Sequence, residues 1–143
     1  MKKKSAHDTQ WEPSVLDIAT FKQLVIDLDS EDENKKTAMK SEKSWFIKFF
    51  APWCGHCQRL APIWSEFNRL HIDEINVGTV DCTTDGGQPL CKAMEVKGYP
   101  TLIFFPGKNE DVKGPTEGRK YQGQRTLEEL EKFALQDGWK SVG

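Results

Sequence analysis

Two cysteines, Cys54 and Cys57, lie three residues apart between an apolar run and a segment with helical periodicity. The preceding run, "SWFIKFFA", is short, aromatic and β-branched, which predicts a buried strand in the middle of a sheet. After the pair, five apolar residues share one helical face: Leu60, Ile63, Trp64, Phe67 and Leu70. The pair therefore lies at a strand-to-helix junction, where open α/β sheets usually place their reactive groups.

This position predicts different properties for the two thiols. At a helix start, free backbone N–H groups and the positive end of the helix dipole favour an anion, so Cys54 is the expected nucleophile. Cys57 lies one turn deeper on the same face, where it can close a disulfide with Cys54 but is poorly accessible. Gly55 is expected to relax the turn, and His56 to add positive charge or a hydrogen bond near the Cys54 thiolate. The predicted chemistry of the pair is thiol–disulfide exchange.

The order of the remaining elements predicts the fold class. Short apolar runs indicate strands over residues 15–18, 44–51, 75–80 and 101–105, with an edge strand near 120–122. Helical spacing over residues 20–28, 54–70, 89–96 and 126–139 alternates with them, and Thr20 and Thr126 are the expected caps of the first and last helices. This alternation predicts an α/β fold in which helices cover both faces of a central mixed β-sheet.

Length and composition predict one globular unit. The 143 residues are 37% apolar and include five Trp, two Tyr and eight Phe, enough for a single sizeable core. The net charge of -2 comes from 20 basic and 22 acidic residues mixed along the chain, which argues against nucleic acid or acidic lipid as a partner. No apolar run approaches the roughly 18 residues of a membrane span, and no apolar stretch follows the basic start to make a signal peptide.

The same patterns predict where the folded domain begins and ends. We expect a flexible N-terminal segment over residues 1–13 and a domain over 14–138, followed by a C-terminal tail over 139–143. A charged stretch over residues 29–43 has no apolar period and is predicted to be a solvated insert.

The segment "APWCGHCQRLAPIW" resembles the active-site segment of the protein disulfide isomerase family. The likeness continues through "GYPTLIFFPG" and "YQGQRTLEELEKF" and covers nearly the whole predicted domain. It implies a thioredoxin fold, the endoplasmic reticulum lumen as the compartment, and no cofactor. It also implies a cis proline at Pro100 beside Cys54, with Tyr99 before it, and an arginine at Arg125 that approaches the resolving cysteine.

Two features depart from most members of that family. Lys48 stands where many members have a buried glutamate that accepts the proton of the resolving thiol, so a lysine beside Cys57 must change proton transfer. The second feature is the pair Cys82 and Cys91 in "VDCTTDGGQPLC". Both features are similar to the three-domain thioredoxin-domain-containing group of the family.

Several residues have competing interpretations. A structural disulfide between Cys82 and Cys91 is favoured over a second redox pair, because closing so short a loop stabilises a fold by about 2.5–3 kcal/mol. A zinc half-site at Cys54 and Cys57, completed by the other cysteines or a histidine, is the alternative to redox chemistry, and the spacing of the second pair argues against it. No metal is therefore expected. Trp53 is interpreted as an apolar contact surface for unfolded polypeptide at the edge of the site, and packing in the core is the rival interpretation.

The main functional hypothesis is a thiol–disulfide oxidoreductase that oxidises and isomerises cysteines of folding secretory proteins through Cys54 and Cys57. Its expected partners are unfolded or misfolded cysteine-containing polypeptides and a redox partner or glutathione. The expected location is the lumen of the endoplasmic reticulum, or the lumenal part of a longer, membrane-anchored protein, and the domain is expected to be monomeric. The alternatives are a redox-weak module that binds clients or a partner, and a cytosolic reductant.

Overall fold

The computed structural model describes residues 12–36, 38–110 and 118–142, which form one mixed five-stranded sheet. The strands are ordered β1 (Ser14–Val15), β3 (Asn76–Asp81), β2 (Trp45–Phe50), β4 (Thr101–Phe105) and β5 (Arg119–Lys120). β1, β3 and β2 are parallel, whereas β4 runs antiparallel to β2, and β5 to β4. The predicted central position of the strand before the cysteine pair is confirmed.

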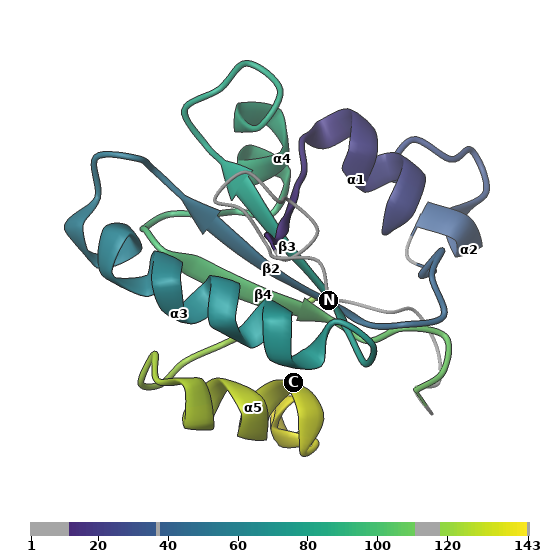
Figure 1. The fold of residues 1–143 in the computed structure, drawn as a ribbon. Coiled ribbons are helices and arrows are strands. Elements are labelled where there is room, and N and C mark those ends of the chain that lie inside the picture. The colour runs from purple at the N-terminus through teal and green to yellow at the C-terminus, as the bar shows by residue number, and fades with distance from the viewer. Residues whose placement is uncertain (1–11, 37, 111–117, 143) are drawn as a thin grey trace, which may run out of the picture.

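Helices cover both faces of this sheet (Figure 1). α1 (Ile18–Leu24) and α4 (Gln88–Ala93) pack on one face, in a core cluster that contains Phe21 and Leu90. α3 (Gly55–His71) and α5 (Leu127–Leu135) pack on the other face, where Trp64 and Leu130 join a second cluster. The prediction of an α/β fold with a doubly covered mixed sheet is confirmed.

Side chains of β2 alternate between the two clusters, as the period of a strand requires. Trp45, Ile47 and Phe49 belong to the cluster under α1 and α4. Phe46 belongs to the cluster under α3 and α5. By this alternation Lys48 lies on the α3 face of the central strand, which matters for the site below.

The N-terminal elements begin differently from the prediction. β1 ends at Val15, and Asp17 rather than Thr20 is the N-cap of α1. The Asp17 carboxylate accepts the Thr20 N–H and the Thr20 hydroxyl accepts the Asp17 N–H, both at 2.9 Å. Thr20 thus contributes as the third residue of a reciprocal capping box, and the helix starts three residues earlier than it would with Thr20 as its N-cap.

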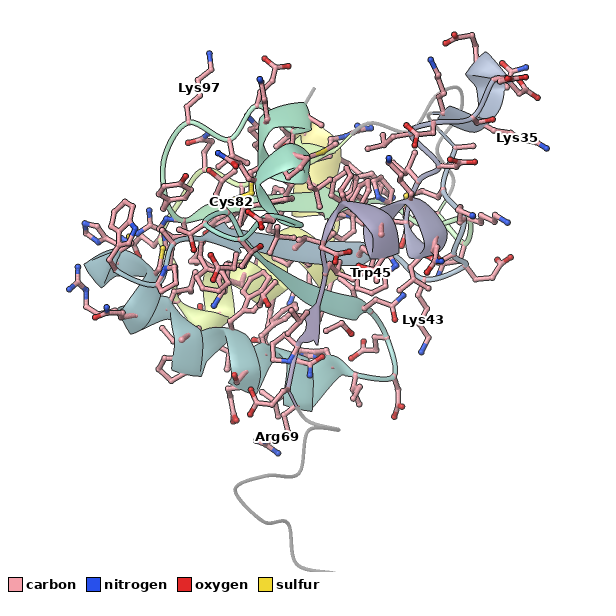
Figure 2. The ribbon with its side chains drawn as sticks, turned by 90° about the horizontal axis from the view of Figure 1, so that it is seen from above. Lys35, Lys43, Trp45, Arg69, Cys82 and Lys97 are labelled. Carbon is pink, nitrogen blue, oxygen red and sulfur yellow. A yellow bond between two sulfur atoms is a disulfide. The ribbon has the colours of Figure 1, made fainter. Side chains whose placement is uncertain are left out.

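The polar stretch over residues 29–43 contains a short helix, α2 (Glu33–Lys36), with no buried residue. Lys35 on this helix points away from the body of the domain (Figure 2), as expected for a solvated segment. Met39 is different, because it is buried in the core and forms an isolated bridge with Ile26. A single apolar residue forms no periodic pattern, so the hydrophobic periodicity of the sequence could not reveal that Met39 is buried.

The folded domain continues past the predicted boundary at residue 138. A short 3₁₀ helix, η2 (Gly138–Ser141), follows α5, and its Trp139 is only 2% exposed. The indole stacks on Phe104 at a centroid distance of 5.1 Å. The prediction of a tail over 139–143 was therefore wrong for Trp139, because one aromatic side chain beyond the last helix completes the core. Residues 1–11 and 143 lie outside the described residues, and so do residues 37 and 111–117.

The two long helices otherwise follow their patterns. In α5, Leu130, Phe133 and Ala134 are buried, and Thr126 is the N-cap, accepting the Glu129 N–H at 3.2 Å. In α3, Leu60, Trp64 and Phe67 are buried.

The inward stripe of α3 then departs from the prediction. Leu70 is exposed, whereas His71 contacts the ring of Phe67. The inward stripe therefore continues by a four-residue step to His71 rather than a three-residue step to Leu70.

Candidate active site

Cys54 is the N-cap of α3, directly after the loop that leaves β2. Its backbone is extended, and its Sγ accepts a hydrogen bond from the Cys57 N–H at 3.4 Å. A sulfur in this position replaces the side-chain oxygen that usually caps a helix. The helix start therefore provides N–H groups for a negative charge on Cys54, as the sequence predicted.

The surroundings of Cys54 lower the pKa of its thiol. The largest cause is a hydrogen bond with the Cys57 side chain, followed by hydrogen bonding to the Cys57 backbone. The His56 backbone and the positive charge of Arg125 contribute further, while partial burial opposes them. The thiolate of Cys54 is thus stabilised by the chain around it, which is the requirement for a nucleophilic cysteine.

Cys57 has the opposite character. It is 3% exposed, and burial raises the pKa of its thiol to about 11, with the neighbouring Cys54 adding to this rise. Hydrogen bonding to the Ala51 backbone and the charge of Lys48 act in the other direction without outweighing burial. Both cysteines are free thiols in this structure. The pair therefore combines one thiol that ionises readily with one that retains its proton.

The Tyr99–Pro100 peptide bond is cis, as the resemblance implied, and it lies beside Cys54. The Tyr99 carbonyl accepts the Cys54 S–H at an S···O distance of 3.6 Å. The sheet explains this approach across 45 residues. Phe49 near the end of β2 pairs with Thr101 at the start of β4, so the segments that flank this pair meet at one edge of the sheet.

Trp53 forms an exposed aromatic surface next to this segment. Its side chain is 70% exposed and meets the Tyr99 ring edge to face at 5.8 Å. Trp53 is therefore not a core residue in this structure. The indole therefore leaves apolar area exposed to solvent beside Cys54.

A groove of about 510 Å³ lies along the cis peptide. Tyr99, Pro100, Tyr121 and Arg125 are among the residues that line it. Arg125 is exposed, and its charge acts on the Cys54 thiol. The expected approach of Arg125 to the resolving thiol of Cys57 stays a prediction.

The structure shows what surrounds Gly55 and the His56 ring. A Cβ at Gly55 would meet only Arg59 Nη1, at an ordinary 3.5 Å, so the turn does not require glycine. The His56 ring is exposed, and its Nδ1 accepts a hydrogen bond from Arg59 Nη2 at 2.9 Å. Hydrogen bonding to the His56 backbone lowers the pKa of Cys54, and the contribution expected from the His56 ring stays a prediction. Sequence reasoning missed Arg59, although its three-residue spacing from His56 was visible.

Lys48 is 5% exposed, on the α3 face of the central strand. Burial lowers the pKa of its ammonium group, and attraction to Cys57 only partly offsets this effect. Lys48 and Cys57 line the same pocket of about 660 Å³. We call it the Lys48 pocket.

The Lys48 pocket also includes Glu12 and Pro13. Glu12 is exposed and accepts a hydrogen bond from the Ser65 hydroxyl at 3.4 Å. These two residues fall in the segment predicted to be flexible, and no local pattern connected them with Cys57.

Cys82 and Cys91 form a disulfide with a Cα–Cα distance of 5.8 Å. Both sulfurs belong to the core cluster under α1 and α4, and Figure 2 shows Cys82 within the body of the domain. Because they are bonded to each other, these cysteines cannot complete a zinc site with Cys54 and Cys57 in this structure. Their burial favours a structural bridge, since labile disulfides are usually exposed or strained. Among residues 12–36, 38–110 and 118–142, no helix is both long and apolar enough to cross a bilayer.

Comparison with known proteins agrees with this geometry. The family model described as Thioredoxin matches residues 25–136. A protein disulfide-isomerase-like protein from Emiliania huxleyi, EhSep2, is 43% identical over 105 residues, covering 72% of this chain and 44% of that protein. Protein disulfide-isomerase 5-1 from Arabidopsis thaliana is 35% identical over 128 residues, covering 87% of this chain and 80% of that protein.

A solved structure is similar over almost the whole chain. The J-Trx1 fragment of ERdj5 superposes with a TM-score of 0.68 at 29% identity, covering 92% of this chain and 54% of that one. The chain thus spans about half the length of some of the relatives it matches. These comparisons confirm the thioredoxin fold that the sequence resemblance implied.

Proposed function

This chain belongs to the thioredoxin family and carries the dithiol site of a thiol–disulfide oxidoreductase, and we propose that it oxidises and isomerises disulfides in folding secretory proteins. The observation that carries the proposal is the contrast between its two thiols. Cys54 caps α3 with a lowered pKa, while Cys57 is buried with a raised one. A pair of this kind separates the attacking sulfur from the resolving sulfur.

In the oxidation of a client, a client thiolate attacks Cys54 Sγ of the Cys54–Cys57 disulfide. A bond forms between the client sulfur and Cys54, and Cys57 leaves as a thiolate that takes up a proton, because its pKa lies near 11. A second client thiolate then attacks the client sulfur of this mixed disulfide. The client disulfide forms, and Cys54 leaves as a thiolate that its N-cap position stabilises.

In isomerisation the reduced site starts the cycle. The Cys54 thiolate attacks a wrong client disulfide and forms a mixed disulfide, which another client thiolate resolves with the correct pairing. If that rearrangement stalls, Cys57 attacks Cys54 Sγ, releases the client thiolate and restores the oxidised site. Release of the client from a stalled mixed disulfide therefore depends on removing the proton from the buried Cys57 thiol.

Four features around Cys54 support a polypeptide client rather than a small disulfide. Trp53 offers an exposed apolar face beside Cys54, and the groove of about 510 Å³ along Tyr99 and Pro100 provides space for a client segment. Backbone groups next to the cis peptide are suited to pairing with such a segment as a short added strand. Arg125 at this groove provides positive charge beside the Cys54 thiolate.

The refolding of a protein with scrambled disulfides tests the enzyme. The intact chain should restore activity to such a protein in a glutathione buffer, and the double variant C54S/C57S should not. The single variant C57S, which retains the nucleophile, should isomerise but accumulate mixed disulfides. Reactivation by the double variant would instead favour a module that binds clients without thiol chemistry.

Equilibration with glutathione tests the direction of the reaction. A protein-disulfide-isomerase-like pair has a reduction potential near about −180 mV, whereas a thioredoxin-like reductant lies near about −270 mV. We expect the higher value, because a stabilised Cys54 thiolate favours the reduced form. A potential near the lower value would assign the chain to reduction rather than to oxidation of clients.

The proposed location is the lumen of the endoplasmic reticulum, alone or as part of a longer protein. The buried Cys82–Cys91 disulfide supports an oxidising compartment. The proposed partners are cysteine-containing polypeptides and either glutathione or a protein that reoxidises the site. The likeness of Lys48 and the extra disulfide to a three-domain group remains a prediction about the whole protein.

A further inference from the structure

We propose that Lys48 accepts the proton of the Cys57 thiol and that the Lys48 pocket is the route by which this proton leaves the site. The inference rests on the proposed function, because it concerns the step in which Cys57 resolves a mixed disulfide. It assigns a role to a buried lysine and to a cavity that the reaction at Cys54 does not use.

The sheet and α3 form opposite walls of this pocket. In the sheet, Lys48 pairs with Thr79 of β3, and Thr79 pairs with Val15 of β1, so these residues form a row across three strands. On α3, Cys57, Ala61 and Ser65 recur every four residues and line the same pocket. Lys48 and Cys57 therefore line one pocket from two different elements.

The Lys48 side chain extends toward the end of the strand where α3 begins. Its Nζ lies 5.1 Å from the centroid of the Phe50 ring, two residues further along β2. The electrostatic influence of Lys48 on Cys57, and of Cys57 on Lys48, agrees with this direction. The amine is thus buried close to the one thiol whose proton must be removed.

The Lys48 pocket is separate from the groove beside Tyr99 and Pro100. The residues that line it differ from those that line the groove beside Tyr99 and Pro100, with none in common. It reaches the edge strand β1, where Val15 is exposed and where Glu12 and Ser65 are hydrogen-bonded. A client segment that occupies the groove beside Tyr99 and Pro100 therefore does not fill the Lys48 pocket, which stays open to water.

The charges around Lys48 suit a proton acceptor. From α3 the titratable group facing it is Cys57, and from the segment before β1 it is the exposed Glu12. Its neighbours on β3 and β4, Thr79 and Leu102, carry no charge. Because burial lowers the pKa of Lys48, a larger fraction of neutral amine is present than at an exposed lysine.

The step is balanced without an added reagent. The neutral Lys48 amine takes the proton of the Cys57 thiol, which gives an ammonium and a thiolate. The thiolate attacks Cys54 Sγ, so the Cys54–Cys57 bond forms, the bond from Cys54 to the client breaks, and the client leaves as a thiolate. Lys48 then returns its proton to water in the pocket. The carboxylate of Glu12 at the opening can receive it on the way to solvent.

A single-turnover experiment with the 143-residue chain tests this role. Reduced protein is mixed with a peptide disulfide, and samples quenched in acid are analysed by mass spectrometry for mixed disulfide and for oxidised protein. The variants are K48A, which leaves space in the pocket, and K48M, which fills it without an amine. K92A on α4, on the opposite face of the sheet, is the matched control.

We expect K48A to slow the resolution step about 100-fold, as loss of a general base does, while leaving attack by Cys54 unchanged. Ethylamine should then accelerate resolution in K48A in proportion to its free-base concentration. It should have little effect in K48M or in K92A. Recovery by an amine that fits the vacated space distinguishes a proton acceptor from a structural lysine.

Two outcomes would overturn the inference. Resolution in K48A at the wild-type rate would mean that Cys57 loses its proton without Lys48. Slow resolution in K48A with no greater response to ethylamine than in K48M would mean that Lys48 acts through packing. Failure of wild-type Cys54 to form the mixed disulfide is a separate result, because it would overturn the proposed function itself. If K48A folds poorly, the resolution rate is measured in K48M instead, because replacing a buried charge with an apolar side chain is often tolerated by the fold.

Discussion

Removal of the Cys82–Cys91 disulfide should destabilise the domain without disabling its active site. The bridge joins residues nine positions apart. A loop of that length restricts the unfolded chain enough to contribute about 2.6 kcal/mol at 25 °C. Both cysteines are also buried in the core cluster under α1 and α4, so replacing them adds a small packing loss to this entropic loss.

The measurement requires a background in which the active-site thiols cannot form a disulfide. In a C54S/C57S chain, urea unfolding is compared with and without the further changes C82A and C91A. With the slopes usual for small proteins, a loss of about 2.6 kcal/mol moves the midpoint down by roughly 1–3 M urea. In the chain with intact Cys54 and Cys57, the changes C82A and C91A should leave the alkylation rate of Cys54 unchanged.

Two results would contradict this reasoning. A loss of stability below about 1 kcal/mol would show that loop closure does not explain the bridge. A fall in client oxidation at a temperature where the variant remains folded would show that Cys82 and Cys91 take part in electron transfer, as a second redox pair would. Reducing the disulfide in the C54S/C57S background provides the matched control, since it opens the same loop without changing a residue.

Three further predictions concern separate parts of the domain. Thiolate absorbance of the reduced chain should show Cys54 ionising below the ordinary cysteine range and Cys57 ionising near pH 11. The variant C57A should raise the pKa of Cys54, because it removes the hydrogen bond with the Cys57 side chain that contributes most to lowering that pKa. Burial opposes protonation of His71, but its hydrogen bonds to Glu74 and Glu131, at 2.7 and 2.6 Å, outweigh burial and raise its pKa. The stabilising contribution of His71 is therefore complete below about pH 6.5, the pKa of an unfolded histidine, and is lost as the pH rises through the raised pKa of His71 in the folded state. H71Q should thus reduce the free energy of unfolding more at pH 5.5 than at pH 9. An equal loss at both pH values would refute this reasoning. W139A should cost about 3–5 kcal/mol of stability by urea unfolding, whereas a loss under about 1 kcal/mol would mean that η2 is not part of the core.

The sequence predicted those parts of the site that depend on neighbouring residues. Cys54 caps α3 because a buried strand ends just before it and a helical pattern starts just after it, and both patterns are local. The edge strand, the last helix and its cap at Thr126 were predictable for the same reason. The cis form of Pro100 was implied only by resemblance, since a proline in a sequence is ordinarily trans.

Other features had no local signal. Met39 and Trp139 are single apolar residues outside any periodic run, and each is buried by an element distant in sequence. Glu12 reaches the Lys48 pocket from a stretch without pattern. The sequence could not show that Arg59 contacts the imidazole of His56 or that the turn at Gly55 has room for a Cβ.

The sequence by itself determined that a reactive pair of cysteines sits between a buried strand and a helix, because spacing along the chain fixes strand and helix periods. Only the tertiary structure decided which distant groups set the acidity of each sulfur. Antiparallel pairing of β2 with β4 brings the Tyr99 carbonyl to Cys54, and packing of α3 on the sheet encloses Cys57 with Lys48. The acidity of a thiol depends on solvent, charge and hydrogen bonds supplied by residues far along the chain, and these meet only when the sheet forms.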